Sequence, residues 1–154
     1  MIIEIPKLPP EGAAFRGEEP AALLDLHGPH LARAGGPVRY DLIAQVISHE
    51  LIVRGTVETD LEVECGRCVE FYSTSIREPA FLQSYDLTGG VETVDVTQEL
   101  REAVLLQLPA YPLCRPECRG LCPQCGKNLN EGACACRPPP AEGRWGALDG
   151  LKLP

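Results

Sequence analysis

The sequence predicts an α+β fold, mainly antiparallel β, in which a curled antiparallel sheet packs on one long helix and a cysteine-rich lobe follows. Three observations predict it: apolar and polar residues alternate over 38–85, one helical pattern follows residue 94, and six of the eight cysteines lie in 114–136. Alternation with period two is typical of strands with one buried face. We expect residues 1–113 to form the sheet and helix, and residues 114–154 to form a zinc-stabilised lobe and tail packed on the same domain.

Composition limits the classes of function. The chain of 154 residues carries a net charge of −8. Residues 110–154 hold six basic and four acidic residues, whereas residues 1–109 hold eight basic and eighteen acidic residues. Such an acidic chain is a poor general binder of a phosphate backbone. It contains no run of about 18 apolar residues and no signal-peptide pattern at its start, so we expect a cytoplasmic protein without a membrane span. Disulfides are rare in that compartment, and clustered cysteines there favour metal.

Residues 1–36 are expected to be mostly loop. Ile2–Ile5 is a possible edge strand that Pro6 ends, and Ala21–Leu26 is a short element of either type. His27 and His30 could suggest a ligand pair, but the Gly-Pro between them favours a polar turn.

Three strands are expected next. Val38–Val46 has apolar residues at its even positions, and residues 51–65 show the cleanest alternation in the chain. Gly55 is expected to mark a bulge or bend in that long strand. Cys65-Gly66-Arg67-Cys68 then predicts a two-residue hairpin loop leading into a third strand, Val69–Tyr85, broken at Pro79. Both thiols would stand at one end of the sheet.

A helix is expected to start at Asp95, an N-cap that forms a capping box with Gln98. Its core face consists of Val96, Leu100, Ala103 and Val104, widened by Leu105, Leu106 and Leu108, whereas Glu99 and Glu102 face solvent. Pro109 and Pro112 end it. In the tail, the spacing of Trp145, Leu148 and Leu151 allows a helical turn that docks on the domain or contacts a partner.

All eight cysteines are candidate zinc ligands. Cys122-Pro123-Gln124-Cys125-Gly126 resembles a metal knuckle, because the glycine lets the backbone curl so that both sulfurs face one point. Four thiolates close a tetrahedral zinc site, so eight favour two sites, although the tight Cys134-Ala135-Cys136 spacing leaves one site possible. The candidate ligands are Cys65, Cys68, Cys114, Cys118, Cys122, Cys125, Cys134 and Cys136.

Two partitions of these thiols remain open. One places Cys65 and Cys68 with Cys114 and Cys118, and leaves the last four as a compact second site; we prefer it because the loop from Cys125 to Cys134 is cheap to close. The other joins Cys65 and Cys68 to Cys122 and Cys125 as paired knuckles, with the remaining four thiols in a looser site.

The sequence offers little for catalysis, so we expect a protein that is not an enzyme and has no small-molecule substrate. Three histidines lie in loop-like places, no phosphate-binding glycine motif occurs, and four-thiolate sites are normally closed. Two other classes stay open: a zinc-stapled adaptor, and a thiol redox protein that uses Cys65 and Cys68. Redox chemistry is less favoured because that motif lies between strands and not at a helix N-terminus.

The chain resembles the YceD family of large ribosomal RNA subunit accumulation proteins. The matching motifs are Leu61-Glu62-Val63-Glu64-Cys65-Gly66-Arg67-Cys68, Val94-Asp95-Val96-Thr97, Leu106-Gln107-Leu108-Pro109, the string from Cys114 to Asn130 and Cys134-Ala135-Cys136. The tail, Arg144-Trp145 and Leu148, matches more loosely, with Glu142-Gly143 where an Asp-Pro-like pair is usual.

The resemblance implies a bacterial factor needed for accumulation or processing of 23S ribosomal RNA, associated with assembly of the large subunit. Its expected partners are the large-subunit precursor, through rRNA or basic ribosomal proteins. An acidic sheet face would suit basic proteins, and Arg115, Arg119, Lys127 and Arg137 would suit rRNA phosphate.

Overall fold

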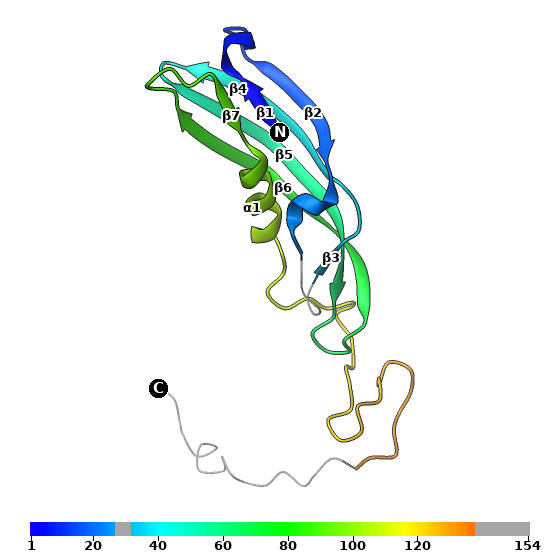
Figure 1. The fold of residues 1–154 in the computed structure, drawn as a ribbon. Helices are drawn as coiled ribbons and strands as arrows, with labels where there is room; N and C mark the ends of the chain where they lie inside the picture. The colour runs from blue at the N-terminus through cyan, green and yellow to red at the C-terminus, as the bar shows by residue number, and fades with distance from the viewer. Residues whose placement is uncertain (27–31, 138–154) are drawn as a thin grey trace, which may run out of the picture.

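The computed structural model describes residues 1–26 and 32–137, and it contains strands, two 3₁₀ turns and one α-helix (Figure 1). In chain order the elements are β1 (Ile2–Glu4), η1 (Ile5–Lys7), β2 (Ala13–Glu19), η2 (Ala21–Leu24), β3 (Ala32–Ala34), β4 (Val38–Ile47), β5 (Glu50–Glu64), β6 (Phe71–Asp86), β7 (Thr93–Asp95) and α1 (Thr97–Leu106). Every strand pairing is antiparallel. The predicted class, mainly antiparallel β with one helix and a cysteine-rich C-terminal region, is confirmed, whereas the strand pairing does not support the predicted curl of the sheet.

The larger sheet is built around β5. One edge of β5 pairs with β6. The other edge pairs with β4 along one half of its length and with β3 near its C-terminal end. β2 pairs with the free edge of β4. Between β3 and β4 the chain crosses the edge of β5, where the Gly35 amide donates to the Asp60 carbonyl at 2.8 Å. A Cβ on Gly35 would lie 2.9 Å from that oxygen, so this close crossing requires glycine. The hydroxyl of Thr59, the buried polar side chain of the sheet, donates to the Pro37 carbonyl at 3.1 Å.

β5 and β6 form one long hairpin, and β5 buries alternate residues as its sequence predicts. The register shifts at Gly55, because Gly55 pairs with Phe81 whereas Val57 pairs with Glu78. β6 therefore carries one extra residue there, and this bulge accommodates Pro79 within a continuous strand. The irregularity expected at Gly55 is confirmed. The break expected at Pro79 is wrong. Proline has no backbone N–H, and at the bulged position no N–H is needed to bond with β5, so the strand continues through it.

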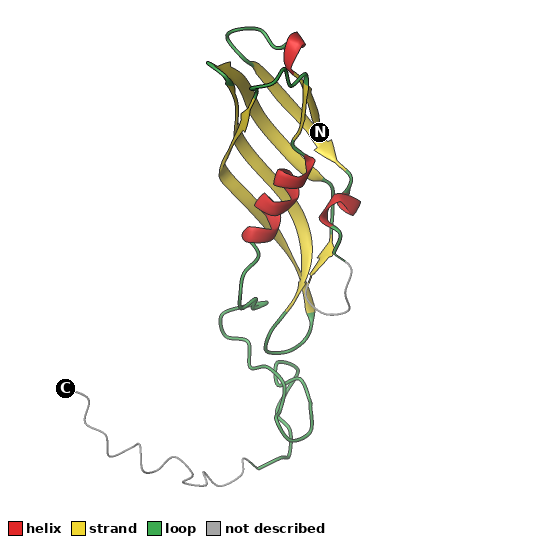
Figure 2. Ribbon diagram, turned by 60° about the vertical axis from the view of Figure 1, so that its left-hand side comes forward, coloured by secondary structure: helices red, strands yellow, loops and turns green. Residues whose placement is uncertain are grey.

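One face of the sheet carries the core. The small β1–β7 ribbon, η2 and α1 lie over this face (Figure 2), and α1 packs against β5 and β6. The core joins Ile3, Leu24, Leu100 and Val104 to the inward-facing residues of β4 and β5. The cysteine-rich segment lies beyond one end of the sheet, next to the β5–β6 loop (Figure 1).

The helix differs from its prediction at both ends. It starts at Thr97 with Val96 at the N-cap, so Asp95 and Gln98 do not form a capping box; instead Asp95 Oδ1 accepts the Thr97 amide at 3.0 Å. The helix has 10 residues and is not long. Leu106 is 82% exposed, because six residues after Leu100 the side chain has turned about 240° from the core face. Glu99, expected in solvent, is half-buried.

The N-terminal region holds more structure than its sequence predicts. The residues of β2 were expected to be loop, because Pro9-Pro10 and Gly12 precede them, yet the strand pairs with β4 along its whole length. The edge strand expected at Ile2–Ile5 is present as β1, and the short element after Ala21 is a 3₁₀ turn. The predictions for His27, His30 and the tail of residues 144–153 lie outside the described residues. Within the described ranges, no helix combines the length and apolar character that a membrane crossing requires.

Candidate metal centre

The loop between β5 and β6 is wider than the predicted two-residue hairpin. β5 ends at Glu64 and β6 begins at Phe71. Within the loop the Val69 amide donates to the Cys65 carbonyl at 2.9 Å, and the Cys65 amide donates to the Glu70 carbonyl at 2.9 Å. A two-residue loop would have kept Cys65 and Cys68 as paired strand residues. The wider loop instead frees backbone amides to face the Cys65 sulfur.

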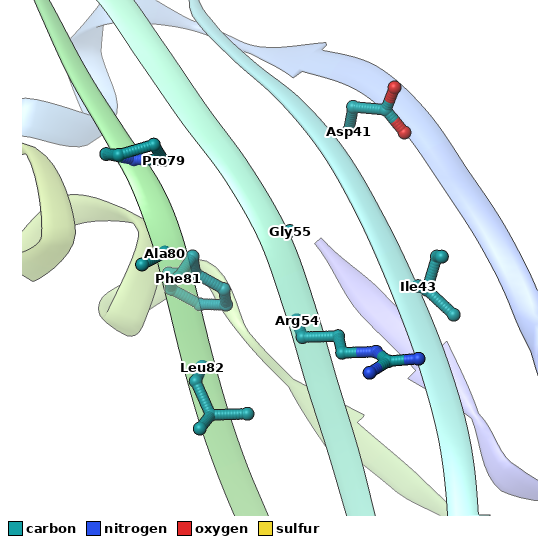
Figure 3. A pocket seen from close by; sticks show the side chains of 8 residues that line it. All are labelled: Asp41, Ile43, Arg54, Gly55, Pro79, Ala80, Phe81 and Leu82. Atoms are coloured by element: carbon teal, nitrogen blue, oxygen red, sulfur yellow. The ribbon is translucent and has the colours of Figure 1, made fainter.

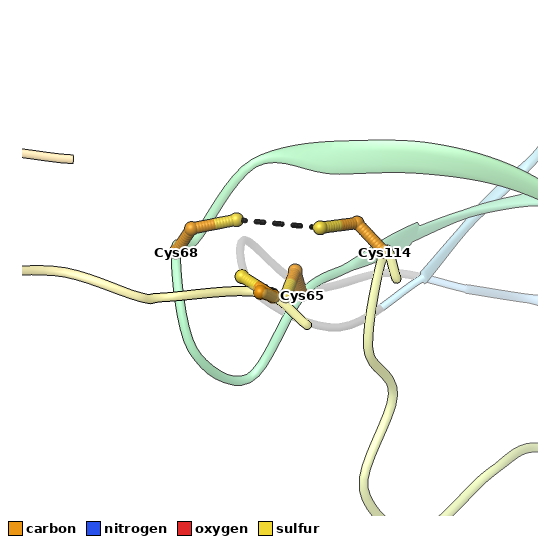
Figure 4. A group of neighbouring side chains, drawn as sticks. Cys65, Cys68 and Cys114 are labelled. Atoms are coloured by element: carbon orange, nitrogen blue, oxygen red, sulfur yellow. Dashed lines mark hydrogen bonds between the residues drawn. The ribbon is translucent and has the colours of Figure 1, made fainter. Parts of the chain in front are cut away.

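The first cluster consists of Cys65, Cys68, Cys114 and Cys118, which we call the first quartet. After α1 the chain returns to the loop, where the Gly66 amide donates to the Pro112 carbonyl at 2.8 Å. The four Sγ atoms all lie within 4.8 Å of one another, and Cys68 faces Cys114 across the group (Figure 4). Two of the Sγ···Sγ distances, Cys65–Cys118 and Cys68–Cys114, are 3.8 Å.

These distances fit a shared metal ion. A disulfide would bring two sulfurs to about 2.05 Å. A regular tetrahedron with metal–sulfur bonds of about 2.3 Å, the value for zinc, has sulfur–sulfur edges of about 3.8 Å. The donor set, four sulfurs of which three are buried, is the one that structural zinc sites use.

The second quartet consists of Cys122, Cys125, Cys134 and Cys136, whose Sγ atoms also lie within 4.8 Å of one another. Its knuckle closes as expected: the Gly126 amide donates to the Cys122 carbonyl at 2.9 Å, and Gly126 has a φ of +71° that favours glycine. This quartet is more open to solvent than the first, because only Cys122 is buried and Cys125 is exposed.

The structure groups the sulfurs as the preferred partition predicts, and it does not form the alternative pairing of Cys65 and Cys68 with Cys122 and Cys125. Although only one residue separates Cys134 from Cys136, both sulfurs belong to the second quartet. Two groups of four thiols are thus compatible with two zinc ions. The metal itself remains a prediction.

Electrostatics within each quartet favours a cation. Burial raises the pKa of Cys65, but the backbone amides of Cys114, Cys68 and Arg67 lower it more, to about 6. The amides of Cys125 and Gln124 lower the pKa of Cys122 to about 6. Each quartet therefore readily holds one thiolate.

Further thiolates in the same quartet are disfavoured. Burial and then the neighbouring thiols of Cys118 and Cys65 raise the pKa of Cys114 to about 12. Cys125 and then burial raise the pKa of Cys136 to about 12. Like charges this close suppress each other's ionisation, and a divalent cation would compensate all four.

Two residues that sequence reasoning missed hold the first quartet in place. The Arg67 guanidinium donates to the Cys118 carbonyl at 3.0 Å, and the Arg67 carbonyl accepts the Leu121 amide at 3.0 Å. Asn130 Nδ2 donates to Cys118 Sγ at 3.3 Å and is the first cause of the lowered pKa of Cys118. The only sequence signal was their position inside cysteine motifs, which does not say what they contact.

A shallow hollow lies on the outer face of the sheet (Figure 3). It measures about 500 Å³ and is lined mainly by apolar side chains, among them Ile43 and Leu82, with Arg54 beside them. Its acidic lining residue, Asp41, is bound by Arg16 Nε at 3.0 Å. No nucleophile is among its lining residues, so the hollow suggests no reaction.

Comparisons with known proteins agree with the cysteine pattern. The profile of the family described as "Large ribosomal RNA subunit accumulation protein YceD" matches residues 82–152. A protein of Mycobacterium tuberculosis named only as uncharacterized is 32% identical over 138 residues, which cover 73% of this chain and 67% of the relative. The chain belongs to the YceD family. No solved structure matches it significantly.

Two plant members of the YceD family are similar over shorter segments. The chloroplastic YCED homolog 1 of Zea mays is 35% identical over 51 residues, covering 32% of this chain and 17% of the relative. The Arabidopsis thaliana homolog of the same name is 31% identical over 62 residues, covering 40% of this chain and 19% of the relative. Both are named as large ribosomal RNA subunit accumulation proteins.

Proposed function

We propose that this protein is a non-enzymatic zinc-binding factor that acts in the cytoplasm and supports accumulation or processing of 23S rRNA during assembly of the large ribosomal subunit. Membership of the YceD family supports the ribosomal role. The two cysteine quartets support zinc as a structural ion that fixes the lobe to the sheet. Neither quartet would catalyse, because four protein sulfurs leave no open position for water or substrate.

The proposed partner is the large-subunit precursor, contacted through rRNA or through basic ribosomal proteins. The acidic strand face is a weaker candidate than its sequence predicts, because Arg39 already binds Glu58 at 3.2 Å and Asp60 at 3.1 Å. In the lobe, the Lys127 amine donates to the Ala133 carbonyl at 3.1 Å, which leaves it less available for phosphate. Arg115, Arg119 and Arg137 are exposed and are the better candidates for RNA contact.

The ribosomal role is tested by depletion. Cells depleted of the protein are expected to lose mature 23S rRNA relative to 16S rRNA, and the full chain should restore it. Normal 23S levels after depletion would contradict the role.

RNA contact is tested by charge reversal. Arg115→Glu with Arg119→Glu should weaken binding to purified large-subunit precursor and reduce its dependence on salt, because fewer counterions are released. Lys7→Glu is the control, since Lys7 lies in η1 and pairs with Glu4 at 2.7 Å. Unchanged binding by the double variant would assign the contact to another surface.

Zinc is tested by metal analysis of the purified full chain. Two zinc ions per chain, with thiols that do not react until a chelator is added, are expected. A metal-free protein with a reversible Cys65–Cys68 disulfide would instead favour the redox alternative.

A further inference from the structure

Asn130 connects the two quartets. It lies between Cys125 and Cys134 in the chain, inside the loop that the second quartet closes, yet its carboxamide contacts a sulfur of the first. Its Nδ2 donates to Cys118 Sγ at 3.3 Å and to Asn128 Oδ1 at 2.8 Å. Its Oδ1 accepts the backbone amide of Arg119 at 2.9 Å. Both ends of the carboxamide are therefore engaged, and its orientation is determined by the Arg119 amide.

A hydrogen bond to a ligand atom affects metal binding. An N–H donor stabilises a metal-bound thiolate and orients it, and loss of such an outer contact typically reduces metal affinity 10- to 100-fold. Cys118 is 4% exposed, so water would not replace the donor easily. Asn130 is thus placed to strengthen metal retention in the first quartet without being a ligand.

The position of Asn130 depends on the second quartet. Its segment is held by the Leu129 amide, which donates to the Gly120 carbonyl at 2.9 Å, and by the Asn130 amide, which donates to Asn128 Oδ1 at 3.0 Å. Beyond these bonds, residues 125–134 are closed into a loop by the gathering of Cys125 and Cys134. A metal ion there would restrict this loop and reduce the entropy lost when Asn130 meets Cys118.

We propose that Asn130 is a positioning residue for the first quartet, and that zinc in the second quartet strengthens zinc retention in the first through it. The inference rests on the proposed zinc binding. Because coupling between two binding equilibria is reciprocal, zinc in the first quartet strengthens binding in the second by the same factor.

The experiment measures zinc affinity by competition with a chromophoric chelator, with the full chain and Zn²⁺ alone as the probe. Asn130→Ala should weaken the first quartet about 10- to 100-fold. Asn130→Asp keeps the shape and the oxygen that accepts the Arg119 amide, but it places a carboxylate oxygen against the thiolate. It should therefore weaken the first quartet at least as much. Glu131→Gln, next to Asn130 in the chain, is the matched control and should leave the first quartet unchanged, because the Glu131 side chain is exposed.

Coupling is measured in a double-mutant cycle. Cys134→Ser with Cys136→Ser removes the second quartet and should lower zinc affinity of the first. Adding Asn130→Ala to that background should then reduce the zinc affinity of the first quartet by a smaller factor than Asn130→Ala does in the wild-type chain. Cobalt(II) bound in place of zinc gives sulfur-to-metal charge-transfer bands, which report whether the first quartet keeps four sulfur ligands in each variant.

The outcomes separate the inference from the proposed function. Wild-type affinity in Asn130→Asp would show that Asn130 only supports the Arg119 backbone, and the inference would be wrong. If the combined variant lost zinc affinity by the product of the two separate losses, the two changes would act independently and the proposed coupling would be wrong. Both results leave two zinc ions per chain intact. A wild-type chain that binds no zinc would instead overturn the zinc part of the proposed function, and the inference with it.

Discussion

The guanidinium of Arg67 donates a hydrogen bond to the backbone carbonyl of Cys118 across 3.0 Å, joining the β5–β6 loop to the chain that follows α1. The same side chain reaches the Pro116 carbonyl at 3.4 Å, and Gly120, with a φ of +72°, passes so close that a Cβ would lie 2.9 Å from the Arg67 carbonyl. Hydrogen bonds therefore hold residues 116–121 against the β5–β6 loop, beside the four sulfurs of the first quartet.

Arg67→Ala should lower the free energy of unfolding by about 1 kcal/mol, because it removes a charge-assisted bond to a partly buried carbonyl. Urea denaturation of the zinc-loaded chain measures it. Arg16→Ala is the control: Arg16 is 76% exposed in its pair with Asp41, and its loss should cost less than about 0.5 kcal/mol. Equal losses in the two variants would contradict the role of Arg67.

Gly55→Ala should be among the most damaging single changes in the sheet. Its Cβ would lie 2.1 Å from the Asp41 carbonyl, at a φ of +153°, so overlap and strain add to about 3 kcal/mol or more. Gly89→Ala is the matched control, because its φ is +93° but nothing lies within 4 Å of the added carbon; we expect about 1 kcal/mol. Thermal denaturation compares them, and similar melting temperatures would contradict the close contact.

Leu100→Ala should cost about 3 kcal/mol of unfolding free energy, because Leu100 is fully buried between α1 and the sheet. Leu106→Ala removes the same atoms from an 82% exposed site and should change stability by less than about 0.5 kcal/mol. Denaturant titration of both variants tests whether the helix is oriented as described. A large loss in Leu106→Ala would favour the core role that the sequence predicts.

Metal removal should separate the lobe from the sheet. The main core contains no cysteine among its described members, whereas Cys65, Cys68 and Cys118 form a cluster of their own. A chelator should therefore leave the far-ultraviolet circular dichroism of the strands largely intact, while trypsin cleavage after Arg119 and Lys127 accelerates. If the chelator removed the strand signal in circular dichroism as well as accelerating cleavage, the sheet itself would depend on metal.

Asp60 should make stability depend on pH in the acid range. The Ser75 hydroxyl, at 2.7 Å, and then Arg39 hold the pKa of Asp60 below its ordinary value. A carboxyl whose folded pKa is lowered stabilises the fold above its unfolded pKa of about 3.9, and this contribution is lost as pH falls through the folded value. Asp60→Asn should be less stable than wild type at pH 7 and equal to it near pH 2. A difference that persists at pH 2 would point to packing instead.

The sequence predicts the features that follow from local spacing. The alternation in β5 identifies its buried face, and the short loop between Cys125 and Cys134 favours the grouping of sulfurs that the structure has. β2 escapes prediction because its strand depends on a neighbouring edge and not on its own residues. The roles of Arg67 and Asn130 could not be predicted, because each side chain binds an atom that no local sequence pattern specifies. Arg67, for example, lies 51 residues from Cys118 in the chain.

The first quartet takes two thiols from before α1 and two from after it. Cys65 precedes Cys118 by 53 residues, and Cys68 precedes Cys114 by 46. In a growing nascent chain, the two early thiols therefore emerge long before their partners and stay open to oxidants and stray metals. The quartet can close only once the hairpin, the helix and Cys118 have all left the translating ribosome, so its closure follows the emergence of the whole sheet and helix.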